Sequence, residues 1–322
     1  MKNLNLSLTM LAALLYAPVA IAATTPVLGA NLAGFSVFAG VGGVTNTPTE
    51  YGPHGSLALV RTDLSNSLGT TNTTASGITG FFGAMQHTGP GNVAGYGINP
   101  GFASGNSAIH QGDALSTTTH LELMAAQSQL EAMRVGKGIT ATFGDLSGMT
   151  LAPGVYSLTA PAYNLGVGKT LILDGSGYVN PQWVFLATSS IIMGTDSRVS
   201  LVNADAGASV YWDAVSSITL NVGASMVGNF LAQTSITMLA NANIVCGRAL
   251  DGSLAGGGNV TMSSNLINSG NCNTNGILST SGLNGATATT PPANNVPEPG
   301  TLPLVLVALG ATALLPLRRK ST

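Results

Sequence analysis

Short runs of alternating apolar and polar residues fill the second half of the chain. Between residues 149 and 267, apolar β-type triplets such as those at 171–173 and 191–193 are separated by Gly, Asn or Asp turns. Residues 216–227 are nearly repeated 18 positions later. A repeat this short, with no helical period, is typical of a chain coiled into stacked β-rungs that cover each other's apolar faces. The pattern therefore predicts an all-β solenoid.

The triplets also predict which side chains face outward. Side chains alternate along a strand, so the outer residues of each triplet should face the core and the middle residue should face away. The triplet around Ser200 matches the triplet around Thr219 at an offset of 19 residues. We expect one outward column made of Ser200, Thr219, Thr237 and Thr261. The alternative is that these are ordinary solvent-facing strand residues favoured by β-propensity.

One segment has a helical period instead. Apolar residues recur at helical spacing at Leu123, Ala126, Leu130 and Met133. Thr119 and Glu122 have the spacing of a capping box, and together these features predict an amphipathic helix over residues 116–135. Such a helix would cover an apolar flank of the rungs. Residues 46–112, which are rich in Gly, Thr and Asn and have little period, are expected to cap one end of the stack.

The composition narrows the range of partners. Only 7% of the 322 residues are charged, against roughly 25% in an ordinary soluble domain, and the net charge is −2. Basic residues cluster only at the extreme C-terminus. Because nucleic-acid binding depends on neutralising phosphates with Lys and Arg, nucleic acid is not an expected partner.

The N-terminus and the two cysteines indicate export. Residues 1–22 form a signal peptide, with Lys2 before an apolar core and a small-residue cleavage site ending at Ala22. In an oxidising compartment, Cys246 and Cys272 are expected to form one disulfide. The alternative is two separate buried thiols.

The C-terminal region has three consecutive parts after the main domain. Residues 273–295 are an uncharged Ser/Thr/Gly/Pro/Asn linker, and residues 296–322 contain Pro297, Glu298 and Pro299, an apolar stretch and a basic end. The apolar stretch is a marginal membrane segment whose C-terminus should stay cytoplasmic. This arrangement resembles the PEP-CTERM sorting signal of Gram-negative bacteria. The resemblance implies transient inner-membrane anchoring, cleavage by an exosortase, and delivery to the outer cell surface or an exopolysaccharide matrix.

Motifs spread from Leu28 to about Ile267, within an expected β-helix domain at residues 23–272, resemble the bacterial and fungal ice-binding family. Their order and spacing carry the resemblance, at residues 35–39, 44–47, 97–101, 109–114, 145–156, 171–175, 210–212 and 247–250. The resemblance implies a right-handed β-helix with one long α-helix packed alongside. It also implies adsorption to an ice surface through a flat face carrying Thr and other small residues.

Candidate catalytic chemistry is sparse. A carbohydrate-active β-helix enzyme needs paired carboxylates or an acidic calcium site, whereas the aspartates here are scattered and mostly adjoin turn residues. Asp213, beside Trp212, is the acidic residue to check for a cleft. The four histidines have no metal-ligand spacing, so we expect no catalytic residues, no metal and no cofactor. The favoured function is ice binding. The alternatives are a matrix or adhesion protein that binds exopolysaccharide and, with less support, an enzyme.

Overall fold

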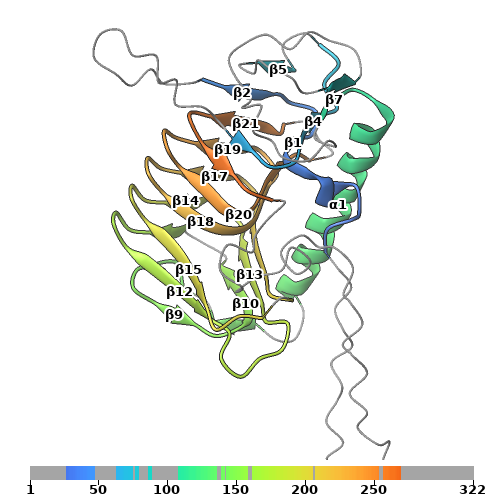
Figure 1. Ribbon diagram of the computed structural model, residues 1–322. Helices are drawn as coiled ribbons and strands as arrows, with labels where there is room; N and C mark the ends of the chain where they lie inside the picture. Colours follow the sequence, from blue (N-terminus) through green and yellow to red (C-terminus); the bar gives the residue numbers. More distant parts are fainter. Residues whose placement is uncertain are drawn as a thin grey trace, which may run out of the picture. The chain divides into compact units, whose positions relative to one another are not determined.

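Short parallel strands, stacked coil upon coil, make up most of the structure (Figure 1). The computed structural model describes residues 27–47, 63–74, 77–79, 86–88, 108–135, 139–141, 143–158, 162–205, 207–253 and 257–269. The strands of each coil pair in parallel with those of the coils above and below, as in a β-helix. The predicted fold class is therefore confirmed at the level of a parallel β-architecture with one long helix.

Each coil crosses three faces in the same order. One coil contains β12 (Thr170–Asp174), β13 (Gln182–Ala187) and β14 (Ile191–Met193). These three strands pair respectively with β15 (Arg198–Val202), β16 (Ser209–Ala214) and β17 (Ser217–Leu220) of the next coil. We name the faces by the strands of this coil. The covered face contains β13, the open face contains β14, and the third face contains β12.

The strands of the three faces follow one another in space as follows. The open face contains β11 (Tyr163–Leu165), β14, β17, β19 (Ser235–Met238), β21 (Asn259–Met262), β2 (Val44–Asn46) and β5 (Ile78–Thr79). The covered face contains β8 (Ile139–Ala141), β10 (Gly154–Leu158), β13, β16, β18 (Ser225–Ala232), β20 (Asn243–Asp251), β1 (Phe35–Ala39), β4 (Ser67–Thr70), β7 (Ala108–Gln111) and β6 (Gln86–Thr88). The third face contains β9 (Thr150–Leu151), β12, β15, the first residues of β18 and β20, β22 (Leu266–Ile267) and β3 (Asp63–Leu64).

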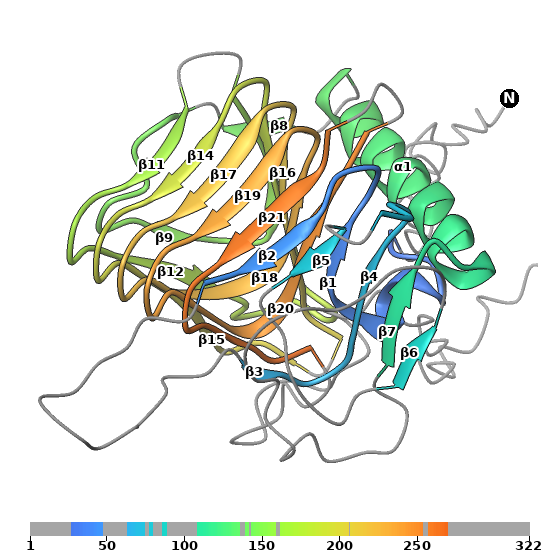
Figure 2. The same ribbon diagram turned by 90° about the horizontal axis from the view of Figure 1, so that it is seen from above.

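One coil in the middle of the stack is assembled from both ends of the described chain. It consists of β22, β1 and β2. β22, near the C-terminal end, pairs with β20 and β3, whereas β1 and β2, near the N-terminal end, pair with β20 and β21. β4 and β5 then continue the stack beyond β1 and β2 (Figure 2). The expected capping region at 46–112 thus contributes strands to the stack where it is described.

Two charged side chains, one buried and one partly exposed, hold the N-terminal segment against the coils. The fully buried Arg248 of β20 donates hydrogen bonds to Asn229 Oδ1 (3.1 Å) and to the carbonyl oxygen of Ala33. Glu122 of the long helix accepts hydrogen bonds from Asn31 Nδ2 (2.8 Å) and from the backbone N–H of Leu32 (2.7 Å), at the start of the short 3₁₀-helix η1 (Leu32–Gly34). Both side chains therefore bridge segments far apart in sequence.

The long helix α1 (Ala114–Val135) begins two residues before the predicted start. Asp113 Oδ1 accepts the backbone N–H of Ser116 (2.7 Å), so Asp113 caps the helix. The predicted capping box of Thr119 and Glu122 is wrong, because Glu122 binds the N-terminal segment instead. The apolar side of α1 packs on the covered face, with Leu123, Ala126 and Leu130 of the helix against Val184, Leu186, Tyr211, Leu231 and Leu250.

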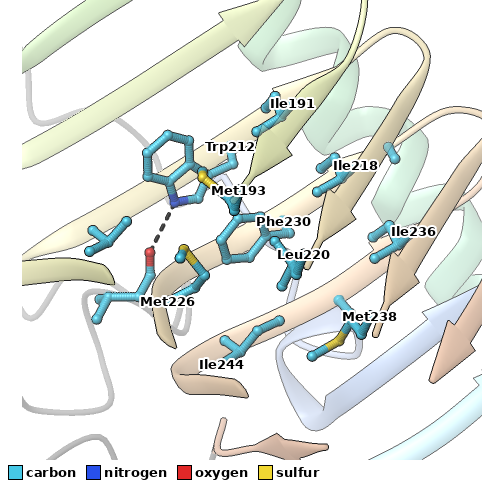
Figure 3. Packing of buried hydrophobic residues seen from close by; sticks show 14 of the residues in the cluster. Ile191, Met193, Trp212, Ile218, Leu220, Met226, Phe230, Ile236, Met238 and Ile244 are labelled. Carbon is cyan, nitrogen blue, oxygen red and sulfur yellow. Dashed lines mark hydrogen bonds between the residues drawn. The ribbon is translucent and has the colours of Figure 1, made fainter. Parts of the chain in front are cut away.

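Inside the coils, aromatic rings stack from one rung to the next. The ring centroids of Tyr156 and Phe185 lie 5.2 Å apart, those of Phe185 and Trp212 3.9 Å, and those of Trp212 and Phe230 5.7 Å. These residues are register partners on successive strands of the covered face. Figure 3 shows Trp212 and Phe230 facing the aliphatic and methionine side chains that point inward from the open face. Trp212 Nε1 donates to the carbonyl oxygen of Val227 (2.9 Å), so the buried indole is hydrogen-bonded.

Several predicted features fall outside the described residues: the signal peptide at 1–22, Cys272, the linker and the C-terminal motif at 297–299. Cys246 is disulfide-bonded. Its pairing with Cys272 stays a prediction. Among the described residues, no helix is long and apolar enough to cross a membrane.

Gly247 provides a test of the coil packing. Its φ is +141°, and a Cβ at this position would lie 1.8 Å from the carbonyl oxygen of Gly228 in the neighbouring coil. We expect Gly247→Ala to lower the free energy of unfolding by about 3 kcal/mol or more, because backbone must move to relieve the clash. Chemical denaturation measures this loss. Gly34→Ala is the control: no atom lies within 4 Å of its added Cβ, so unchanged stability is expected there. Equal stability of the two variants would contradict the packing described.

Candidate functional site

The open face presents one outward residue from each of its seven strands, in register. On β17 and β19, Ile218 and Ile236 are buried, whereas Thr219 and Thr237 between the inward positions are partly exposed. The strand pairings continue this alternation across the whole face. The outward column, in spatial order, is Asn164, Ile192, Thr219, Thr237, Thr261, Thr45 and Thr79.

A second outward row runs beside this column. Ser217, Ser235 and Asn259 are register partners two residues before the threonines of their strands. Neighbouring strands are spaced by about 4.8 Å and alternate residues along a strand by about 6.6 Å, so the two rows form a two-dimensional lattice. Thr79 Oγ1 lies 3.3 Å from Thr45 Oγ1, and Asn259 Oδ1 accepts the N–H of Gly43 (3.0 Å). The bond between Asn259 and Gly43 crosses the junction between the two ends of the described chain, and the contact between Thr45 and Thr79 continues the lattice beyond it.

The structure brings together three of the four residues predicted to form a column. Thr219, Thr237 and Thr261 are register partners on the open face. Ser200 does not belong with them: it lies on the third face, where it pairs with Ile172. The 19-residue offset that linked Ser200 to Thr219 joins two strands of the same coil, so this assignment was wrong.

Sequence reasoning missed the other members of the column because the coils differ in length. The paired residues Ile191 and Ile218 are 27 positions apart, whereas Ile218 and Ile236 are 18 apart. A fixed offset therefore finds one pair and misses the next. The signal that could have found Ile192 is the apolar triplet at 191–193, whose exposed middle residue has the same pattern.

The other two faces differ from the open face in charge and access. α1 packs on the covered face. The third face carries Asp174 on β12 and Arg198 on β15. No strand of the open face contains a charged residue. Of the three faces, the open face is the one that is both uncovered by α1 and neutral.

Asp213 and Asp251 are buried in strands, whereas three other aspartates make hydrogen bonds typical of turns. Asp145, Asp174 and Asp205 accept the backbone N–H groups of Ser147, Ser176 and Gly207, as expected of turn residues. Asp213, by contrast, is buried on the covered face near Glu131 of α1. Burial, followed by hydrogen bonding and repulsion from Glu131, raises the pKa of Asp213 well above its ordinary value. It faces a packed helix rather than a cleft.

The described residues offer no metal centre either, since no group of three or more His, Cys, Asp or Glu side chains there could hold an ion. What the open face offers instead is a regular, neutral array of small hydroxyl- and methyl-bearing side chains. The class of protein that this defines is a parallel, β-helix-like stack of coils with one uncovered, regularly ordered face.

Comparison with known proteins gives the family. The model of the ice-binding-like family matches residues 57–268, and the chain belongs to that family. The ice-binding protein of Nostoc sp. (strain HG1) is 36% identical over 162 residues, which span 50% of this chain and 56% of the relative. This chain thus covers little more than half of that relative's length.

Solved structures agree. A crystal structure of an ice-binding protein from an Antarctic biological consortium is 26% identical, with a TM-score of 0.56 over 78% of this chain and 95% of its own. An ice-binding protein from the Antarctic ascomycete Antarctomyces psychrotrophicus is 25% identical, with a TM-score of 0.53 over 75% of this chain and 97% of its own.

Asp251 tests the electrostatics of the coil interior. Burial raises the pKa of Asp251 to about 8, against a smaller opposing effect of the Gly252 backbone N–H. A carboxyl whose pKa is about 4 in the unfolded chain then reduces stability progressively as the pH rises from about 4 to about 8. We expect Asp251→Asn to unfold at a higher temperature than the parent at pH 8, with the difference vanishing near pH 4.

Asp174→Asn is the control with the opposite sign. Hydrogen bonds from Asn203 and Ser176 lower the pKa of Asp174, so its contribution to stability is present above its ordinary pKa and is lost as the pH falls. This variant should therefore be no more stable than the parent at pH 8. Thermal melts from pH 4 to pH 8 measure both effects, and a parent-like pH profile for Asp251→Asn would contradict the assignment.

Proposed function

We propose that this protein adsorbs to ice through the open face and has no catalytic role. The observation that carries the proposal is the outward column, seven strands long and in register, on a face whose strands contain no charged residue. Side chains held at a constant rung spacing can order the water layer next to them. Charged groups would instead bind water strongly and in a different geometry. Membership of the ice-binding-like family supports the same conclusion.

Threonine suits this surface for two physical reasons. Its branched side chain is stiff at χ1, so little rotamer freedom is lost when the surface is covered. It also presents a methyl and a hydroxyl group together, which allows apolar contact and hydrogen bonding at the same position. Five of the seven column strands place Thr beside Thr in consecutive rungs, at Thr219, Thr237, Thr261, Thr45 and Thr79. We take the winding of the coils to be right-handed, the hand of nearly all parallel crossovers.

The central test places a bulky side chain on the column. Thr219→Tyr should reduce thermal hysteresis and recrystallisation inhibition by about fivefold or more, because a ring at the centre of the contact holds the neighbouring rows away from the ice. Thr170→Tyr, an outward position on the third face, is the matched control and should retain parent activity. Circular dichroism checks that both variants fold. Parent activity in Thr219→Tyr, or no ice shaping by the parent, would overturn the proposal.

We also propose that the chain is exported and sorted by its C-terminal motif. The signal peptide at 1–22 and the Pro297–Glu298–Pro299 motif with its apolar and basic flanks support this route. An exosortase would then release the protein from the inner membrane to the outer surface or the exopolysaccharide matrix of a Gram-negative cell. A matrix role that uses the same surface against exopolysaccharide is the second candidate, and the sorting motif is what favours it.

Fractionation tests the sorting route. Glu298→Ala, or removal of residues 296–322, should shift the protein away from the surface fraction, because the processing enzyme would no longer recognise the tail. Glu131→Gln, inside the β-helix domain, is a control that should not change the distribution. An unchanged distribution of both tail variants would rule out sorting by this motif. Binding of the purified protein to exopolysaccharide without any ice shaping would favour the second candidate.

A further inference from the structure

The turns that leave the open face carry apolar side chains at positions where turns usually carry polar ones. Val167 is 70% exposed and Val222 is 43% exposed, and both lie in the turn that follows an open-face strand. Turns favour Gly, Asn, Asp, Ser and Pro. Exposed apolar groups gathered in one area, unlike scattered ones, indicate contact with something.

Backbone hydrogen bonds place these side chains in a regular row. Gly168 N–H donates to Thr195 O (2.8 Å), Asp196 N–H to Val222 O (2.9 Å), and Gly223 N–H to Ala240 O (3.1 Å). In each bond, the residue that supplies the carbonyl oxygen occupies the same position in its coil as the residue just before the donor occupies in the neighbouring coil. Asn241 N–H donates in the same way to Ser263 O (3.3 Å), so the corner row, in spatial order, is Val167, Thr195, Val222, Ala240 and Ser263.

The turn geometry explains how such a row is possible. In each coil the residue after the row member has a positive φ: Gly168, Asp196, Gly223, Asn241 and Ser264. The left-handed conformation needed at the corner is supplied by these residues, so the row position itself is free to hold a β-branched side chain. The row thus repeats with the rungs, at the spacing of the outward column.

We propose that the corner row belongs to the ice-contacting surface and extends it around the edge of the open face. The inference rests on the proposed function. Three of the five members are β-branched, and Val has the shape of Thr, so the row continues the stiff, methyl-bearing array of the column. Ile192 of the column and Leu239, which directly precedes Ala240 of the row, are each 38% exposed and add apolar surface to this array.

Charge marks where this extended surface ends. From the serine row through the column to the corner row, no member is charged. The first charged side chains lie just beyond the row: the exposed Asp196 directly follows Thr195, and Lys169 lies two residues after Val167. The neutral array therefore includes the corner row and stops directly beyond it.

The experiment compares tyrosine substitutions at matched exposed positions in the purified full-length protein. Val222→Tyr and Val167→Tyr should each at least halve thermal hysteresis at equal protein concentration, because the ring would prevent the corner from approaching ice. Val222→Thr, which keeps the shape, should retain parent activity. Val179→Tyr, in the loop between β12 and β13 and 81% exposed, is the matched control and should also retain it.

The outcomes separate this inference from the proposed function. If Thr219→Tyr loses activity while both corner variants behave like Val179→Tyr, the corner row is excluded and the ice-contacting open face stands. If Thr219→Tyr keeps parent activity, the proposed function fails and the inference fails with it. Thermal melts close to that of the parent ensure that lost activity is not lost folding, and Val167→Tyr decides the case if Val222→Tyr does not fold.

Discussion

Register between parallel strands is the constraint on which this molecule depends. Each rung must place its inward side chains directly over those of the rung below, and the stacked rings of Phe185, Trp212 and Phe230 hold that alignment in the interior. A shift by one residue would turn the inward set outward. The packing of Ile218 on Ile236 inside the coil therefore also fixes Thr219 beside Thr237 outside it. Order on the surface follows from order in the core.

The surface is also a long-range assembly. Thr45 and Thr79 come from the N-terminal third of the described chain, yet they complete a column begun by strands of the C-terminal half. Arg248 and Glu122 hold the segment that leads into β1 and β2, and both do so through hydrogen bonds with groups distant in sequence. These two side chains thus help to hold in place the strands that complete the neutral open face.

Part of this arrangement could be predicted from the sequence and part could not. The parallel rungs, the long helix and the pairing of Thr219 with Thr237 followed from periodicity, because those coils are short and carry no insertion. Ser200 was assigned to the wrong face because apolar–polar–apolar triplets occur on every face, and an offset does not say which. The burial of Arg248 could not be predicted, because no local sequence pattern marks a buried cation. Its hydrogen-bond partner, the carbonyl oxygen of Ala33, lies far away in the sequence. The column beyond Thr261 depended on strands that pair across more than 200 residues.

The coil shared by the two ends has a consequence for how the protein is made. β1 and β2 leave the ribosome early, but their partners β20 and β21 are synthesised last. Until then the N-terminal strands have unpaired edges on that side, and pairings of such long sequence separation form slowly. The chain must therefore avoid premature association of these early strands with other molecules until β20 and β21 close the gap.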